Sequence, residues 1–454
     1  MVLRRPTLPA AGACLLSFAA FVLAQRAADV SVIDLMVYRA EGWAVRNGED
    51  LYALRVTHAD LPATYPPFAA LLFLPLTLLD VPELRTLAAV TNLVLLVVLV
   101  QLSLRLLGRP ARLPRPAAAL GLAAVAVWCE PVWTTLRYGQ VNLLLAALVL
   151  WDLTRRPGHR WAGVGIGVAA GIKLTPALFA VFLALCGLAE AGRRRRRGGR
   201  PGGLWNARLR QAAVATGAFL GTALLSAVVL PRDSHRFWTE VLFAADRAGA
   251  TEGTANQSLH GVAARLLHTG DPGAFAVALC AVAAAAGLGT AVAAFLATPR
   301  RLPYAPAWAV LACAVTALLI SPVSWSHHWV WAVPIVLLLG AEALRRGDVR
   351  WWAGAGIAGA LFCSYALWWV PNGRDGGAGP LPELDQHGGE MLLSAVYPVT
   401  GTAFLAVAAA VSVRALRRPL PYEAARPAAP AEAPVPAETA AAGPATPAQA
   451  VAKE

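Results

Sequence analysis

Long apolar stretches that recur along the whole chain constrain its fold more than any other sequence feature. Of its 454 residues 57% are hydrophobic and only 14% are charged, whereas soluble domains carry roughly 25% charged residues. A soluble protein could not hide so much apolar surface, because even large domains keep much of their surface in water. The pattern excludes a soluble enzyme and a disordered chain, and it predicts an all-α polytopic membrane protein.

A membrane span needs about 20 predominantly apolar residues, and this rule predicts about twelve spans. The ranges are 8–25, 85–107, 116–132, 140–154, 161–175, 176–191, 210–230, 274–297, 304–321, 329–344, 351–370 and 391–413. The segment 161–191 is long for one span and short for two, with an interruption at 173–176. The segment 65–79 contains three prolines, and we expect it to be interfacial or re-entrant because proline breaks helices.

The basic residues give the predicted spans an orientation. The net charge is +13, and it lies in short arginine runs between apolar stretches, without the aromatic interleaving of a nucleic-acid-binding face. If the N-terminus is cytoplasmic, the clusters at 105–115, 155–160, 193–197, 300–301, 345–350 and 414–418 all fall on the cytoplasmic side. The positive-inside rule then predicts a plasma-membrane protein with both termini in the cytoplasm. Because the basic residues lack the pattern of a nucleic-acid-binding face, we expect no nucleic-acid partner.

The chain divides into two parts by composition. Residues 1–418 hold every predicted span, whereas 419–454 consist mainly of Ala, Pro and Glu and cannot bury enough apolar surface to fold. We expect the first apolar stretch to be an uncleaved helix and the tail to be disordered and cytoplasmic. The six cysteines stand singly in apolar segments, without metal-ligand spacing, and are interpreted as small packing residues.

The first outer loop, residues 26–64, contains a predicted amphipathic helix with Asp34, Tyr38 and Glu41 on one face. The simplest interpretation is that Asp34 caps this helix, where a carboxylate also suits the helix dipole. The alternative is that its carboxylate takes part in chemistry at the membrane surface.

Other polar motifs collect at the same predicted outer side. Lys173 interrupts an apolar stretch, which costs about 2.5–3.5 kcal/mol on insertion scales. It therefore needs either a buried anionic partner or a route along which to snorkel to the headgroups. His327 and His328 have no third metal ligand nearby in the sequence, so hydrogen bonding to a phosphate is preferred over zinc binding.

Several of these motifs, in this order, resemble glycosyltransferase family 87 over about residues 10–415. The matching strings are Asp34-Leu-Met-Val-Tyr38, Gly48-x-x-Leu-Tyr52, Tyr65-Pro-Pro-Phe68, Gly139-Gln140-Val-Asn142, Gly171-Ile-Lys173-Leu-Thr-Pro176, Asn256-Gln257-Ser258-Leu and Ser321-Pro-Val-Ser-Trp-Ser-His327-His328-Trp329. This family comprises actinobacterial polyprenol-phosphate-mannose-dependent α-1,2-mannosyltransferases with the GT-C fold.

The resemblance implies an inverting transfer of mannose from polyprenyl-phosphate mannose to a mannosylated lipid or cell-envelope glycan, on the periplasmic side. It makes Asp34 the catalytic base, and it places Lys173, His327 and His328 where they could bind the donor phosphate. We expect the remaining substrate contacts from Tyr38, Tyr65, Arg137, Gln140, Asn142, Asn256 and Gln257. Leu35 follows Asp34, so no adjacent carboxylate pair exists, and we expect transfer without a metal or other cofactor.

Two alternatives remain open from the sequence. A related GT-C enzyme could transfer arabinofuranose or glucose, because pocket shape cannot be read from these motifs. A lipid or solute transporter is the alternative from another class. Transporters place ionisable groups near the bilayer midplane within repeated halves, whereas here the polar motifs lie at the predicted outer ends and no repeat is evident.

Overall fold

The structure is a computed structural model that describes residues 6–108, 114–156, 158–196, 205–244, 247, 249–373 and 382–418. These residues are mainly helical and form no strand, only two isolated β-bridges. The compact helical unit extends to Arg417. The predicted disordered tail, 419–454, lies outside the described residues, so this division of the chain stays a prediction.

Six segments of the described chain are long and apolar enough to cross a membrane. They are α1 (Thr7–Ala27), α4 (Val81–Leu107), α10 (Ala207–Val229), α13 (Gly273–Arg301), the segment Ser326–Arg346 and α18 (Val396–Arg417). The segment Ser326–Arg346 consists of η6 (Ser326–Trp331) and α15 (Ala332–Arg346).

Shorter helices complete the described unit. Those of the first half are α2 (Ile33–Asn47), η2 (Leu51–Ala53), α3 (Pro67–Phe73), η3 (Leu74–Leu78), α5 (Arg115–Ala126), α6 (Glu130–Tyr138), α7 (Asn142–Leu153), α8 (Val164–Ile172) and α9 (Ala177–Arg196). Those of the second half are α11 (Pro231–Thr239), η4 (Val241–Phe243), α12 (Leu259–Leu266), α14 (Ala305–Ile320), α16 (Val349–Cys363), η7 (Ala366–Trp369) and α17 (Gly389–Ser394).

Every predicted span coincides with a helix or a broken helix, which confirms the all-helical polytopic prediction. The predicted span 116–132 corresponds to α5 and α6, which are bent by 81° at the break between them. The ambiguous segment 161–191 holds two helices, α8 and α9, with the break at the predicted place. Several of these helices are shorter than a helix that crosses a bilayer, so the count of twelve stays a prediction.

Large apolar side chains are exposed on the outer helices. Leu15 and Leu16 of α1 and Leu224 and Leu225 of α10 are all exposed, although a soluble protein would bury such contiguous apolar surface. These faces fit a hydrocarbon solvent, and the protein is a multi-pass membrane protein.

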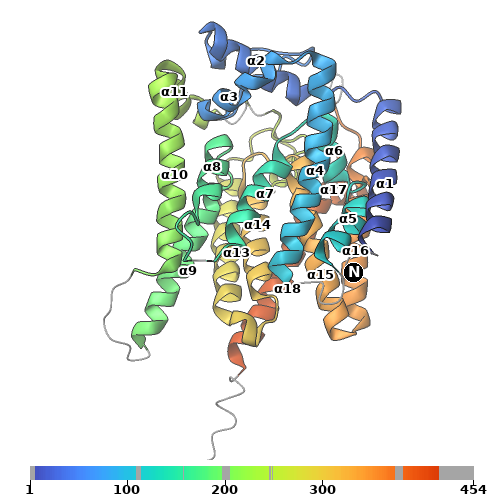
Figure 1. The fold of residues 1–454 in the computed structure, drawn as a ribbon, viewed down its shortest axis with the longest axis vertical. Coiled ribbons are helices and arrows are strands. Elements are labelled where there is room, and N and C mark those ends of the chain that lie inside the picture. The colour runs from blue at the N-terminus through green and yellow to red at the C-terminus, as the bar shows by residue number, and fades with distance from the viewer. Residues whose placement is uncertain are drawn as a thin grey trace, which may run out of the picture. The chain divides into compact units, whose positions relative to one another are not determined.

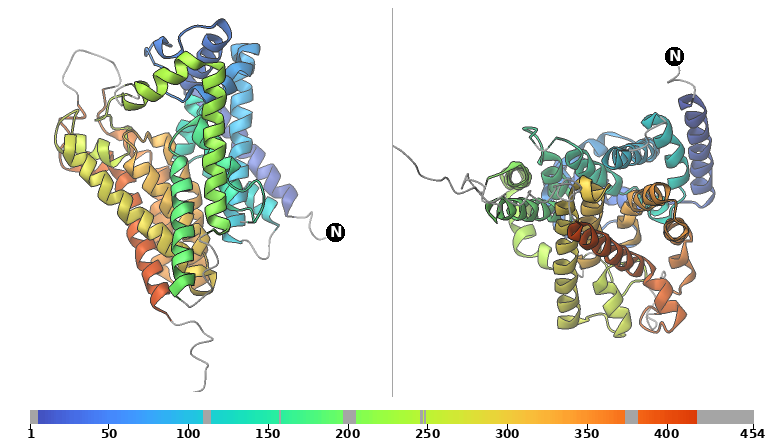
Figure 2. Two further views of the ribbon diagram at one scale, coloured as in Figure 1. Left: turned by 90° about the vertical axis from the view of Figure 1, so that its left-hand side faces the viewer. Right: turned by 90° about the horizontal axis from the view of Figure 1, so that it is seen from below.

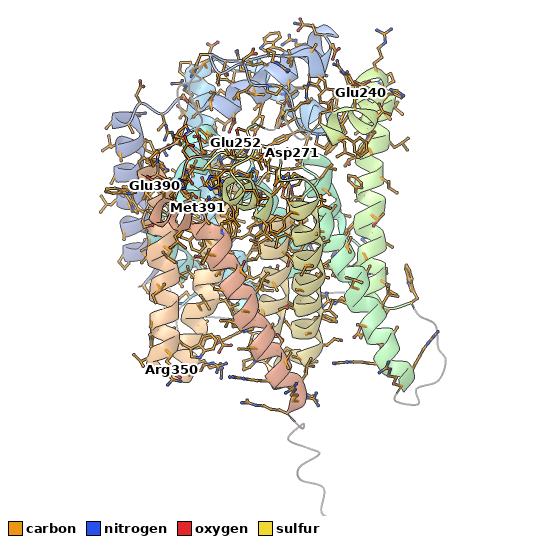
Figure 3. All side chains as sticks on the ribbon, turned by 180° about the vertical axis from the view of Figure 1, so that it is seen from behind. Glu240, Glu252, Asp271, Arg350, Glu390 and Met391 are labelled. Atoms are coloured by element: carbon orange, nitrogen blue, oxygen red, sulfur yellow. The ribbon has the colours of Figure 1, made fainter. Side chains whose placement is uncertain are left out.

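The two ends of the long helices differ in character. Short helices α2, α3 and α11 gather at one end, where α11 turns away from the axis of α10 (Figures 1 and 2). The segment 65–79, predicted not to cross, forms α3 and η3 there and packs against α2. Arg350 lies at the opposite end from Glu240, Asp271 and Glu390 (Figure 3). We call the end that carries α2 and α3 the loop end.

Small residues bring α8 close to α10 and thereby place the segment that follows α8. A Cβ atom on Gly171 would lie 2.2 Å from Oγ1 of Thr222, and one on Gly167 would lie 2.4 Å from the carbonyl oxygen of Ala215. This four-residue spacing of glycines lets membrane helices approach closely. Helix α8 ends at Ile172, Lys173 adopts an extended conformation, and Pro176 precedes α9. The break therefore presents Lys173 at a fixed position.

Candidate active site

The start of α2 is anchored on the corner that follows α6. The backbone N–H of Val32 donates to the carbonyl of Arg137 at 3.0 Å, and Gly139 turns the chain at a φ of 70° directly beside the side chain of Leu35. Val32, not Asp34, occupies the N-cap position, and Asp34 makes no capping hydrogen bond. The interpretation of Asp34 as a helix cap is therefore wrong, because its carboxylate is used elsewhere.

The Asp34 carboxylate belongs to a network of side chains. Nε2 of Gln140 donates to Oδ2 of Asp34 at 2.6 Å, and Oε1 of Gln140 accepts from the hydroxyls of Tyr38 at 2.7 Å and Tyr65 at 3.1 Å. Among the described residues, Asp34 has no other hydrogen-bond partner. Gln140 thus fixes one carboxylate oxygen of Asp34 and leaves the second available.

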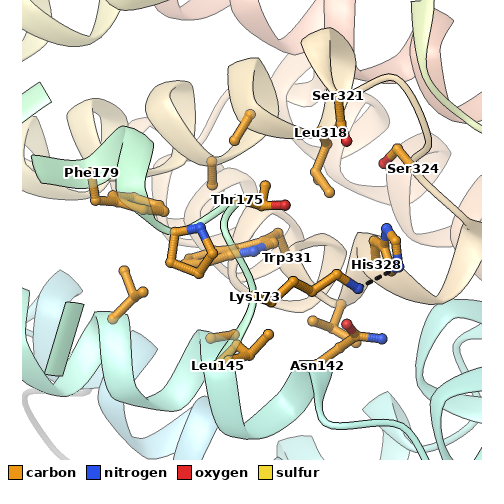
Figure 4. Close-up of a pocket in the computed structure, with 16 residues that line it drawn as sticks. Asn142, Leu145, Lys173, Thr175, Phe179, Leu318, Ser321, Ser324, His328 and Trp331 are labelled. Atoms are coloured by element: carbon orange, nitrogen blue, oxygen red, sulfur yellow. Dashed lines mark hydrogen bonds between the residues drawn. The ribbon is translucent and has the colours of Figure 1, made fainter. Parts of the chain in front are cut away.

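The same network continues to Lys173 and His328. Nζ of Lys173 lies 3.4 Å from the hydroxyl of Tyr65 and 2.8 Å from Nε2 of His328, and the latter contact is drawn in Figure 4. The Lys173 side chain thus points toward polar groups of the protein, so the snorkelling interpretation is wrong. One connected set of side chains links Asp34 to Lys173 and His328, and we call it the cavity cluster (Asp34, Gln140, Tyr65, Lys173 and His328).

The cavity cluster lines a cavity of about 1160 Å³ at the loop end. Asp34, Tyr38, Tyr65, Arg137, Gln140, Lys173, His327 and His328, all predicted as site residues, line it. A smaller cavity of about 50 Å³, shown in Figure 4, adjoins it at Lys173 and His328 and has mainly apolar walls, among them Leu145, Phe179 and Leu318. The larger cavity has room for a sugar and part of an acceptor.

Burial changes the acidity of the two α2 carboxyl groups in the cavity. Desolvation raises the pKa of Asp34 to about 6, while the hydrogen bond from Gln140 and the charge of Lys173 act in the opposite direction. Desolvation raises the pKa of Glu41 to about 8. A carboxyl group with a pKa near 6 is ionised at neutral pH and is a better proton acceptor than an ordinary aspartate.

His327 is held through its backbone and faces the cavity with its ring. Its carbonyl accepts from Oγ1 of Thr135 at 3.0 Å and from Nδ2 of Asn142 at 3.1 Å. Its ring contacts Tyr138 edge-on, and its Nε2 is a buried atom without a hydrogen-bond partner. Asn142 therefore holds the backbone of His327. It lines the smaller cavity and is not among the residues that line the larger one.

Asn256 and Gln257 are not among the residues that line the cavity, and their predicted sugar contacts stay a prediction. Oδ1 of Asn256 accepts from the backbone of Ser324, and Nε2 of Gln257 donates to the carbonyls of Thr254 and Ser394. Both side chains are fully buried. Their amides are saturated by backbone groups, because the loop around 249–258 has no helix or sheet to satisfy it internally.

Three residues of this region were not predicted as site residues. Glu130 is fully buried, lines the cavity and accepts hydrogen bonds from Thr134, Ser326 and Tyr397. Glu41 lines the same cavity two turns after Asp34, and Tyr52 orients Tyr65 by donating to its carbonyl at 2.8 Å. The signal for Glu130 was a carboxylate inside an otherwise apolar run, because such a group needs partners.

Among the described residues, no three His, Cys, Asp or Glu side chains are arranged to hold a metal ion. The site instead offers a candidate base, an amine and two imidazoles around a cavity. Fold and site together define the class of the protein as a polytopic membrane enzyme.

Comparison with known proteins identifies the kind of enzyme. The model of glycosyltransferase family 87 matches residues 63–322. A Mycobacterium tuberculosis protein named polyprenol-phosphate-mannose-dependent alpha-(1-2)-phosphatidylinositol mannoside mannosyltransferase is 35% identical over 336 residues, which are 70% of this chain and 72% of the relative. The Mycolicibacterium smegmatis protein of the same name is 35% identical over 365 residues, 76% of this chain and 77% of the relative.

A second Mycobacterium tuberculosis relative is named for a phosphatidylinositol pentamannoside acceptor; it is 36% identical over 303 residues, 66% of this chain and 63% of the relative. A crystal structure of ArnT from Cupriavidus metallidurans bound to undecaprenyl phosphate resembles 88% of this chain and 77% of that chain, with 16% identity and a TM-score of 0.42. The chain belongs to glycosyltransferase family 87, and it is a membrane glycosyltransferase.

Proposed function

We propose that the protein transfers a mannosyl group from polyprenyl-phosphate mannose to a hydroxyl of a mannosylated lipid. The three mycobacterial relatives are all named for this donor and for phosphatidylinositol mannosides as acceptors. The observation that carries the proposal is the position of Asp34 on the wall of the cavity, with Oδ2 fixed by Gln140 and Oδ1 left open.

In the proposed reaction Asp34 acts as the general base. The acceptor oxygen attacks C1 of mannose, the bond from C1 to the phosphate oxygen breaks, and the hydroxyl proton moves to Oδ1 of Asp34. A single displacement of this kind inverts the anomeric centre and turns a β-linked phosphate ester into an α-mannoside. General base catalysis contributes about 10²–10⁴-fold to such a step.

Lys173, His327 and His328 are the proposed partners of the donor phosphate. Nζ of Lys173 lies beside Nε2 of His328, and Nε2 of His327 is buried without a partner. Groups of this kind stabilise the negative charge that develops on a departing phosphate. The smaller, apolar cavity begins at the same two residues, Lys173 and His328, and suits the first part of the prenyl chain.

The linkage and the side of the membrane belong to the same proposal. The relatives' names support an α-1,2 linkage. By the positive-inside rule, the end of the helices that carries Arg350, opposite the loop end, would lie on the cytoplasmic side. The loop end with its cavity would then face the periplasm, and both termini would lie in the cytoplasm. We propose the GT-C fold on the basis of family membership.

Purified protein in nanodiscs, supplied with radiolabelled polyprenyl-phosphate mannose and a panel of phosphatidylinositol mannosides, tests the reaction. We expect a labelled lipid product whose new mannose is released by an α-1,2-specific mannosidase. Product formation from GDP-mannose but not from the lipid donor would contradict the proposal. Single-cysteine labelling between Arg55 and Leu61 by an impermeant reagent on intact cells tests the side, and protection of that loop would overturn the periplasmic assignment.

A further inference from the structure

Two cysteines that are distant in sequence meet at the loop end of the helices. Sγ of Cys129 lies 3.2 Å from Sγ of Cys363, although 234 residues separate them in the chain. The interpretation of the six cysteines as isolated packing residues is therefore wrong for this pair. The sulfur atoms need to approach by only about 1 Å to reach the length of a disulfide bond, about 2.05 Å.

Both cysteines stand at breaks between helices. Cys129 immediately precedes α6 at the 81° bend that separates α5 from α6. Cys363 is the last residue of α16. A bond between them would join the bend to the end of α16.

Contacts other than the sulfur atoms already hold these two segments together. The hydroxyl of Tyr365 donates to the carbonyl of Trp128 at 3.0 Å, and the rings of Tyr365 and Trp133 pack edge-on with centroids 6.1 Å apart. The residues on either side of the two cysteines are thus fixed near one another. The proximity of the thiols follows from this packing and needs no bond to maintain it.

One of the two thiols lies at the surface of the protein. Cys363, at the end of α16, is exposed, whereas Cys129 is buried. Leu367 and Trp368, which follow shortly after Cys363, line the large cavity, so Cys363 lies near its polar surroundings. Disulfide exchange passes through a mixed disulfide at the attacking thiol, and a second thiol in contact with the first can then resolve it.

We propose that Cys129 and Cys363 form an intramolecular disulfide that staples the bend between α5 and α6. The oxidant is another disulfide. The Cys363 thiolate attacks one of its sulfur atoms and releases the first thiolate; the Cys129 thiolate then attacks Sγ of Cys363 and releases the second. The two cysteines lose two protons and two electrons, and the disulfide reagent is reduced to two thiols.

The staple acts on the segment that carries part of the site. Helix α6 begins with Glu130 and leads through the corner at Gly139 to Gln140, the partner of Asp34. Closing so long a loop of chain restricts the unfolded state strongly. We therefore expect the oxidised protein to melt several degrees above the reduced protein.

The test counts reactive thiols in purified protein that has been treated with oxidised glutathione or with a reductant. Each sample is denatured and labelled with maleimide–polyethylene glycol, so that every free thiol adds a fixed gel shift. We expect oxidation of the wild-type protein to remove two of the six labels. Peptide mapping should then find the peptides with Cys129 and Cys363 joined.

Matched variants separate this pair from the other thiols. Cys280 is half-buried in α13, so Cys280→Ser should still lose two labels on oxidation. Cys363→Ser should lose none, Cys129→Ser should lose at most the label of Cys363 through a mixed disulfide with glutathione, and neither variant should show a difference in melting temperature. Retention of all labels by the wild type, loss that persists in Cys363→Ser, or an unchanged melting temperature on oxidation would overturn the proposal. Cys363 is exposed, so its variant gives the answer even if Cys129→Ser fails to fold.

Discussion

Two polar clusters at the loop end contain similar side chains but differ in what these side chains bind. The cavity cluster joins Asp34 to Lys173 and His328 through side chain–side chain hydrogen bonds and lines the large cavity. A second cluster, which we call the loop cluster, consists of Asn256, Gln257 and Arg265. Its donors are directed at backbone carbonyls, and all three side chains are buried.

The difference shows how to distinguish a binding group from a structural one in a membrane protein. Arg265 donates to the carbonyls of Glu252, Gly253 and Asn256, which lie in irregular chain, and to that of Ser394 at the C-terminal end of α17. Buried backbone groups of this kind cost free energy unless they are paired. The loop cluster therefore holds the wall of the cavity, whereas the cavity cluster leaves Oδ1 of Asp34 without a hydrogen-bond partner among the described residues.

The largest expected effect on activity follows from removing the proposed base. Asp34→Asn keeps the size of the side chain and should reduce kcat for mannose transfer by about 10³-fold, within the usual range for a general base. Glu49→Gln, at an exposed site just beyond α2, is the matched control and should transfer at the wild-type rate. Turnover by matched amounts of folded Asp34→Asn that approaches the wild-type value would refute the base assignment.

The next largest effect should come from the proposed phosphate partner. Lys173→Ala removes a charged hydrogen-bond donor of a kind worth about 1.5–3 kcal/mol, so kcat/KM for the donor should fall roughly 10- to 100-fold. The apparent KM for the acceptor should change little. Titration of each substrate at saturating amounts of the other separates the two parameters, and an equal loss on both would argue against phosphate binding at Lys173.

A smaller, pH-dependent effect should follow from replacing Gln140, the hydrogen-bond partner of Asp34. The base acts when ionised, and burial raises its pKa to about 6, so kcat should rise with pH through about 6 and level off above it. The hydrogen bond from Gln140 stabilises the ionised form, so Gln140→Leu should move this rise to higher pH and lower the rate most on the acidic side. A rate–pH profile of the variant that coincides with that of the wild type would contradict this role.

The smallest effect on activity should come from the loop cluster. Gln257→Leu leaves the carbonyl of Thr254 and the N–H of Tyr397 without their partner and removes one of the two donors to the carbonyl of Ser394, at about 1–3 kcal/mol for an unsatisfied buried group. The melting temperature should fall while the activity per folded molecule stays near the wild-type value. A variant that is stable but inactive would place Gln257 with the cavity cluster and break the comparison.

The sequence predicted the class of fold and singled out all five residues of the cavity cluster as site residues. Apolar stretches of span length can be read from local composition. They must be helical because, in hydrocarbon, the backbone groups of a segment can only be satisfied within the segment itself. Asp34, Gln140, Lys173 and His328 were predicted from an isolated charge or a motif, and the structure places them together. The role of Asp34 as base, the donor and the side of the membrane stay predictions that the experiments above address.

Tertiary structure decided which polar residues face a cavity and which face a carbonyl. Asn256 and Gln140 are both amides in short strings of polar residues, and nothing local separates them. Glu130 acquires its partners from Thr134, Ser326 and Tyr397, and Cys129 meets Cys363 across 234 residues. Hydropathy is a property of each segment and can be read along the chain, whereas hydrogen-bond partners across the helices exist only once the helices have packed.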